Sequence, residues 1–126
     1  MRISCRCAPN NLSYVVQDPT NGTLTKDATY FTWDNASSLK RWGRLCNVGV
    51  LGYLKSALPM WTTRTIGTVS PAPLSTVWFW GNSNTGKPVL FQIEANGVLM
   101  VRALAFTLTS GDDLAVRGSN VYICGA

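Results

Sequence analysis

The stretch that decides the fold is VLFQIEANGVLMV, residues 89–101. Apolar and polar residues alternate from Phe91 to Glu94, and side chains that alternate in this way point to opposite faces of a β-strand. The pair Asn96-Gly97 follows, and it supplies the positive φ angles that a tight turn between two strands requires. The stretch therefore predicts a β-hairpin whose buried face carries Phe91 and Ile93.

The rest of the chain has the same character. Apolar residues do not recur at the three- and four-residue spacing of a helix, whereas short alternating or β-branched runs are bounded by Gly, Pro, Asn and Ser. The runs predicted as strands are residues 13–17, 29–33, 44–54, 63–69, 76–80, 89–94, 98–104, 113–116 and 121–124. About nine short strands of this kind predict an all-β fold, an antiparallel, jelly-roll-like β-sandwich knob.

Three further segments predict how these strands are connected. A second Asn-Gly pair, Asn21-Gly22, predicts another hairpin. The polar segment GNSNTGKP at residues 81–88 predicts an exposed loop between two strands. Neither proline of Pro71-Ala72-Pro73 can donate to a ladder, so this segment is expected to cross between sheets or to lie at a strand edge.

Length and composition predict one globular domain. The chain has 126 residues, of which 46% are hydrophobic and 13% charged, a balance that excludes a disordered chain. No apolar run reaches the roughly 18 residues of a membrane helix, and the N-terminus lacks the apolar core of a secretory signal. We expect residues 1–28 to form an N-terminal segment that serves for attachment, and residues 29–126 to form the knob.

The sequence contains little of the chemistry that enzymes use. It has no histidine, which excludes nucleophilic catalysis through a histidine base. The adjacent acids Asp112 and Asp113 follow a Ser-Gly pair and are expected in a turn rather than in a catalytic site. The chain is predicted to be no enzyme and to need no metal or cofactor. The cysteines lack the C-x-x-C spacing of zinc sites and are predicted to be free thiols; they are Cys5, Cys7, Cys46 and Cys124.

Two features suggest where a partner could bind. The net charge of +5 favours an anionic partner, although only Lys40, Arg41 and Arg44 lie close together along the chain. Trp61 follows turn signals in PMWT, residues 59–62, and an exposed tryptophan could stack on a sugar ring. The receptor-binding candidates are this tryptophan and three residues of the polar loop: Trp61, Asn82, Asn84 and Lys87.

Apolar residues also occur where alternation would send them outward. Residues 77–80, VWFW, are apolar at every position, and the runs 99–101 and 103–106 carry a similar surplus. Such side chains can be covered by further copies of the same domain, or hidden within one protomer by bulges and crossovers. The candidates for an oligomer interface are Trp78, Trp80, Met100 and Phe106.

From Thr29 to the C-terminus, the order of features resembles the head domains of bacteriophage tail-fibre and baseplate proteins. The segments that carry the resemblance are YFTW (30–33), RLCNV (44–48), TIGTV (65–69), PAP (71–73), VWFW (77–80), VLFQI (89–93), ANG (95–97) and SNVYI (119–123). Cys46 stands where the pattern has glycine, and residues 1–28 have no counterpart. The resemblance implies a β-sandwich that forms homotrimers and binds a receptor on loops or between protomers. It carries over no binding residue.

The leading hypothesis is thus a phage virion structural protein, a tail-fibre or baseplate knob that binds a host-surface receptor, with a carbohydrate as the expected receptor. Such a protein would be assembled in the host cytoplasm and located in the virion. The first alternative is a capsid or tail decoration protein that binds only neighbouring virion proteins. The second is a nucleic-acid-binding β-barrel, suggested by the positive charge together with five Trp and four Tyr.

Overall fold

Short apolar runs separated by turns form twelve strands in the computed structural model, which describes residues 20–116 and 120–125. The strands are β1 (Thr20–Asn21), β2 (Thr23–Lys26), β3 (Phe31–Trp33), β4 (Ser38–Trp42), β5 (Leu45–Gly49), β6 (Leu51–Leu54), β7 (Thr63–Ser70), β8 (Val77–Ser83), β9 (Pro88–Ile93), β10 (Val98–Ala103), β11 (Asp113–Val116) and β12 (Val121–Ile123). No helix occurs among these residues, and hence none that could cross a membrane.

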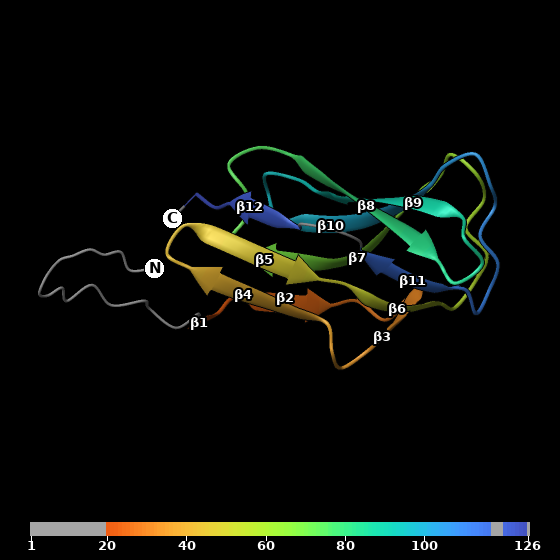
Figure 1. The fold of residues 1–126 in the computed structure, drawn as a ribbon, viewed down its shortest axis with the longest axis horizontal. Coiled ribbons are helices and arrows are strands. Elements are labelled where there is room, and N and C mark those ends of the chain that lie inside the picture. Colours follow the sequence, from red (N-terminus) through yellow and green to blue (C-terminus); the bar gives the residue numbers. More distant parts are fainter. Residues whose placement is uncertain (1–19, 117–119, 126) are drawn as a thin grey trace, which may run out of the picture.

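The strands form two antiparallel sheets that share one core (Figure 1). One sheet has the order β1-β4-β5-β12, and the other has the order β2-β7-β10-β9-β8-β11-β6-β3. The predicted all-β, antiparallel sandwich is confirmed. Its central hairpin is also confirmed, because β9 and β10 are joined at Gly97, which has a φ of 92°.

The larger sheet curls until its edge strand β3 approaches β7. Across this seam the indole Nε1 of Trp33 donates a hydrogen bond to the Ile66 carbonyl, at 3.0 Å. The Asp27 amide donates to the same carbonyl, at 2.9 Å, and so continues the pairing of β2 with β7. The Arg64 guanidinium lies over the Tyr30 ring, 5.2 Å from its centroid. Side chains therefore join the two strands where a backbone ladder would close a complete cylinder.

Glycines make room for aromatic rings inside this curled sheet. A Cβ added at Gly52 would lie 2.6 Å from the Phe31 ring, and one added at Gly81 would lie 2.5 Å from the Phe91 ring. Each ring thus covers a glycine on the neighbouring strand, an arrangement that allows strong local curvature.

Both sheets contribute to one hydrophobic core. The buried side chains of the smaller sheet are Leu39, Cys46, Val48 and Tyr122. Those of the larger sheet include Phe79, Phe91, Ile93, Leu99 and Val101. Phe91 and Ile93 are completely buried, as the alternation in residues 89–94 predicts.

Two loops interlock at one end of the molecule, at the right in Figure 1. They are residues 55–62, between β6 and β7, and residues 104–112, between β10 and β11. Leu58 and Leu108 form a bridge between the two loops, and a matching backbone hydrogen bond lies on each side of this bridge. The Trp61 amide donates to the Ala103 carbonyl at 3.0 Å, and the Gly111 amide donates to the Leu54 carbonyl at 2.8 Å. An approximate twofold relation thus pairs the loops, with Trp61 and Gly111 in equivalent positions.

Several boundaries differ from those expected. The run 44–54 divides at Val50 into β5 and β6, which belong to different sheets. Strands β1, β2 and β4 have no predicted counterpart; with the divided run, they bring the described residues to twelve strands. Residues 20–26 of the predicted N-terminal segment supply β1 and β2, and the predicted strand 13–17 lies outside the described residues.

One predicted connection is wrong, one is shorter than predicted, and one is confirmed. Asn21-Gly22 is not a hairpin, because β1 pairs with β4 in one sheet and β2 pairs with β7 in the other; a Cβ at Gly22 would lie 2.6 Å from the Leu39 side chain. The loop predicted at 81–88 is shorter, because β8 extends to Ser83. The segment Pro71-Ala72-Pro73 lies at a strand edge, the second of its two predicted placements: it joins β7 to β8 of the same sheet, and Pro73 forms a bridge with Cys124 beside β12.

Candidate functional site

The interlocked loops and the turn between β8 and β9 bring the predicted candidates Trp61, Lys87 and Phe106 to one end of the molecule, together with Met60, which was not predicted. We call them the tip cluster; they are Met60, Trp61, Lys87 and Phe106. Thr107 connects the three segments, because its hydroxyl accepts a hydrogen bond from the Met60 amide at 3.2 Å and its carbonyl accepts one from Lys87 Nζ at 3.1 Å. Trp61, Phe106 and Met60 have 57%, 52% and 50% of their surface exposed. The end of the domain is therefore apolar, with one cation beside it.

Trp61 has an unusual backbone conformation. Its φ is 62°, and it is the one non-glycine residue in the described part of the chain with a positive φ. Its equivalent in the other loop, Gly111, has a φ of 88°. A bulky residue is strained in this region, where glycine is not. The loop therefore holds a large aromatic ring in solvent at a position suited to glycine.

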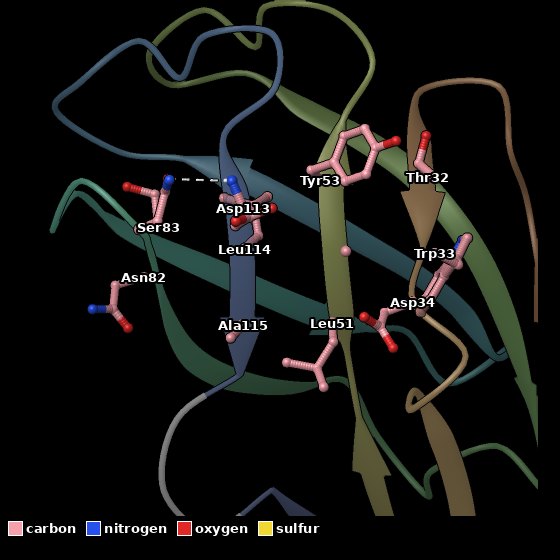
Figure 2. Close-up of a pocket in the computed structure, with 12 residues that line it drawn as sticks. Thr32, Trp33, Asp34, Leu51, Tyr53, Asn82, Ser83, Asp113, Leu114 and Ala115 are labelled. Atoms are coloured by element: carbon pink, nitrogen blue, oxygen red, sulfur yellow. Dashed lines mark hydrogen bonds between the residues drawn. The ribbon is translucent and has the colours of Figure 1, made fainter.

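A groove of about 450 Å³ crosses the outer surface of β3, β6, β11 and β8 (Figure 2). One wall is built around Tyr53, which lies opposite Thr32 on one neighbouring strand and opposite Asp113 on the other. Asn84 completes this wall through its hydrogen bond with Asp113. The other wall contains Asp34, Leu51, Ala115 and Asn82, which are neighbours across the same strands. Between the walls, the paired residues Gly52 and Leu114 form the floor of the groove.

The groove combines an aromatic ring with polar acceptors. Tyr53 is 46% exposed, and the carboxylates of Asp34 and Asp113 come from opposite walls. None of the residues that line the groove is Lys or Arg. Asn82 and Asn84, predicted from the polar loop, lie here rather than beside Trp61 and Lys87. The candidate receptor residues thus fall into two places, and Tyr53, Asp34 and Asp113 were not among the residues predicted for a site.

Three of the four predicted interface residues share the outer face of the larger sheet. Trp78 is opposite Gln92, which is opposite Met100, and Trp80 is opposite Leu90 on the adjoining row. Trp78 and Trp80 are 58% and 63% exposed, and the Trp78 indole donates to Gln92 Oε1 at 3.2 Å. We call this surface the aromatic face; it comprises Trp78, Trp80, Leu90 and Met100. Phe106 belongs to the tip cluster instead, because it lies in the loop after β10.

A second apolar surface lies on the smaller sheet and was not predicted. Trp42, Leu45 and Ile123 form one cross-strand row. We call it the four-stranded patch; its members are Trp42, Leu45, Leu74, Val121 and Ile123, each more than 40% exposed. Alternation along β5 contains the signal, since Cys46 and Val48 are buried and Leu45 must therefore point outward.

The basic trio is bonded to its own fold. Lys40 Nζ donates to Asn21 Oδ1 at 2.9 Å, Arg41 Nε donates to the Gly43 carbonyl at 2.7 Å, and Arg44 Nε donates to the Cys124 carbonyl at 3.3 Å. The three cations therefore hold local structure.

The groups capable of covalent or metal chemistry have structural surroundings. Cys46 and Cys124 are buried and free, and burial, followed by the hydrogen bond with Cys124, raises the pKa of the Cys46 thiol. The Asp112 carboxylate accepts hydrogen bonds from the Thr109 amide and hydroxyl, at 2.9 and 3.0 Å, so it stabilises a turn. Across residues 20–116 and 120–125, no three metal-binding side chains gather.

A scan against protein-family models and a search of curated proteins found no match to this sequence.

Proposed function

We propose that this chain is a non-enzymatic recognition domain of a bacteriophage virion, a tail-fibre or baseplate knob that binds a host-surface saccharide through its tip cluster. The observation that carries the proposal is the exposed, strained Trp61. Backbone strain of this kind destabilises a fold by about 1–3 kcal/mol and concentrates at functional sites. Glycine at position 61 would remove the strain, so the presence of tryptophan there is explained by what its indole ring does.

The surroundings of Trp61 suit a receptor contact. Met60 and Phe106 extend the apolar surface, and Lys87 adds a hydrogen-bond donor beside it. Indole faces stack on the C–H faces of sugar rings, and a nearby ammonium group can donate to hydroxyl oxygens. Both loops are anchored by the bridge between Leu58 and Leu108, so the site is ordered before a ligand arrives.

The knob assembles as a homotrimer through its aromatic face. Two exposed tryptophans in alternate positions of β8 adjoin Leu90 and Met100 on the neighbouring strands. Apolar surfaces of this kind mark interaction sites, and a closed ring of identical copies covers such a surface on every protomer.

The alternative is a decoration protein that contacts only neighbouring virion proteins. The four-stranded patch supports it, because this patch is a second apolar surface on the opposite sheet. A domain with two such surfaces can lie between two structural neighbours.

A glycan array separates the two functions. We expect the purified protein to bind a restricted set of saccharides and Trp61→Gly to lose that binding while it keeps its melting temperature. Absence of binding to every saccharide, together with co-purification with virion proteins, would favour the decoration protein. Equal binding by Trp61→Gly would remove the tip cluster as the receptor site.

A further inference from the structure

We propose that the groove across β3, β6, β11 and β8 is a second binding site, which takes a neutral or amine-bearing saccharide independently of the tip cluster. It rests on the proposed function only in that a saccharide is the expected class of ligand. The geometry of the two walls, the charge of the lining and the pairing of the floor strands support it separately.

The Tyr53 ring is available to a ligand because the core does not use it. Its neighbour on β6, Leu54, points inward and is 1% exposed, whereas Tyr53 points outward and is 46% exposed. On its wall of the groove the ring stands between Thr32 and Asp113 (Figure 2). A flat apolar surface flanked by a hydroxyl and a carboxylate matches a sugar ring, which has an apolar C–H face and polar edges.

The carboxylates lie where they can accept hydrogen bonds from both edges of such a ring. The backbone of Asp113 is positioned by Asn84, because the Asn84 backbone amide donates to the Asp113 carbonyl at 2.9 Å and the Asp113 backbone amide donates to Asn84 Oδ1 at 3.2 Å. Asp34 is positioned by its amide, which donates to the Leu51 carbonyl at 2.9 Å, and by its Oδ1, which accepts from the Ala36 amide at 2.8 Å. The Asp34 carboxylate is thus fixed in advance, and such an acceptor loses less conformational freedom on binding.

The charge of the lining selects among saccharides. Two carboxylates line the groove and no Lys or Arg does, although the whole chain carries +5. Carboxylates accept from sugar hydroxyls and pair with ammonium groups, and they repel sialic acid, sulfate and phosphate. The groove is therefore suited to neutral sugars and amino sugars, in contrast to the anionic partner that the net charge suggests.

The floor excludes a peptide that binds by adding a strand to the sheet. Strand addition requires a sheet edge with free backbone groups, but β6 pairs with both β3 and β11, and β11 pairs with both β6 and β8. Side chains alone can recognise the ligand here. The volume of about 450 Å³ lies within the roughly 300–1,000 Å³ typical of small-molecule sites and suits a short oligosaccharide.

Amide-resolved NMR of the whole chain tests the site directly. The probes are chitotriose as a neutral saccharide, glucosamine as an amine-bearing one and sialyllactose as an anionic one. We expect chitotriose or glucosamine to shift the amides of residues 51–53, 82–84 and 113–115, and sialyllactose to leave them unchanged. Shifts confined to residues 60–62 and 104–107 would overturn the groove site and keep the tip cluster as a receptor site.

Variants then assign the contacts. Tyr53→Ala is expected to weaken binding about tenfold or more, Tyr53→Phe to retain most of it, and Asp113→Asn to lose selectivity against sialyllactose. Trp42→Ala is the matched control, because Trp42 is similarly exposed, at 42%, but lies on the smaller sheet. Equal affinities of Tyr53→Ala and Trp42→Ala would overturn the inference, as would loss of the groove shifts in Trp61→Gly. If no probe shifts the groove amides while binding on the array still requires Trp61, the groove site is overturned and the tip cluster is not.

Discussion

Leu58 and Leu108 exchange both of their backbone hydrogen bonds, at 2.9 Å each, and thereby join two loops that lie far apart in the sequence. Their side chains are 1% and 0% exposed, so the bridge is also part of the core. The exposed tip cluster consequently stands on two of the most deeply buried residues of the domain.

Replacing Leu108 with alanine should lower the free energy of unfolding by about 2–5 kcal/mol, because the change leaves a cavity beneath both loops. Chemical denaturation measures this loss. Met60→Ala is the control; its side chain is half exposed, and we expect a change below about 1 kcal/mol. A similar small loss in both variants would mean that the bridge does not anchor the loops.

Trp61 and Gly111 should respond to substitution with opposite signs. Gly111→Ala should destabilise the fold by about 1 kcal/mol, because a Cβ there meets no neighbour within 4 Å and only the positive φ opposes it. Trp61→Gly relieves a similar strain of about 1–2 kcal/mol and loses a mostly exposed ring, so its melting temperature should be unchanged or higher. A clear drop in melting temperature for Trp61→Gly would indicate that the indole serves stability instead.

The trimer prediction separates two surfaces. We expect light scattering to give three copies for the purified chain and one copy for Trp78→Asp, because a carboxylate would be buried against the neighbouring protomer. Phe106→Asp should remain trimeric, since Phe106 lies in the tip cluster. A wild-type monomer at tens of micromolar would remove the trimer, and dissociation by Phe106→Asp would move the interface to the tip.

Alkaline pH should destabilise the fold through two buried groups. Burial raises the pKa of the Cys46 thiol above its ordinary 9.0, and burial raises the pKa of Tyr122 as well. Because the folded pKa values exceed the unfolded ones, this stabilisation is complete below about pH 9 and is lost as the pH rises further. The melting temperature should therefore fall above pH 9.

The variant Tyr122→Phe isolates the tyrosine contribution. It should be less stable at neutral pH, because the Tyr122 hydroxyl donates to the Pro71 carbonyl at 2.8 Å, but its alkaline fall should be shallower. Parallel curves for the two proteins would assign the alkaline effect elsewhere.

Reductant should leave stability unchanged. Cys46 and Cys124 are free, buried thiols that pack as small apolar side chains. Equal melting temperatures with and without dithiothreitol are the expected result. A large drop on reduction would show that a disulfide contributes to the fold.

The parts of the fold that the sequence predicted are those that local patterns encode. The hairpin of β9 and β10 combines alternation with a turn whose Gly97 requires a positive φ, and both signals lie within a few neighbouring residues. Strand β4 has one buried apolar residue, Leu39, and therefore no recognisable run. The division at Val50 depends on which sheet each half of the run joins, and only tertiary packing decides that.

The candidate sites, too, could be predicted only where local sequence patterns encode them. The exposure of Trp61 could be predicted from the turn signals beside it, but its strain could not, because the backbone angle depends on the partner loop. The groove takes its walls from four strands that are distant in sequence. No spacing along the chain brings Asp34 near Asp113, so these acids could be found only once the order of strands was known.

The seam between β3 and β7 has a consequence for how the domain meets other molecules in solution. Open sheet edges pair readily with the edges of other molecules, and a densely repeated knob would be especially prone to such polymerisation. Here the Trp33 indole donates a hydrogen bond to the Ile66 carbonyl, and Arg64 lies over the Tyr30 ring. The edge strand β3 is therefore held against β7 of its own sheet. A few side chains at one seam thus hinder the pairing of this edge with another molecule.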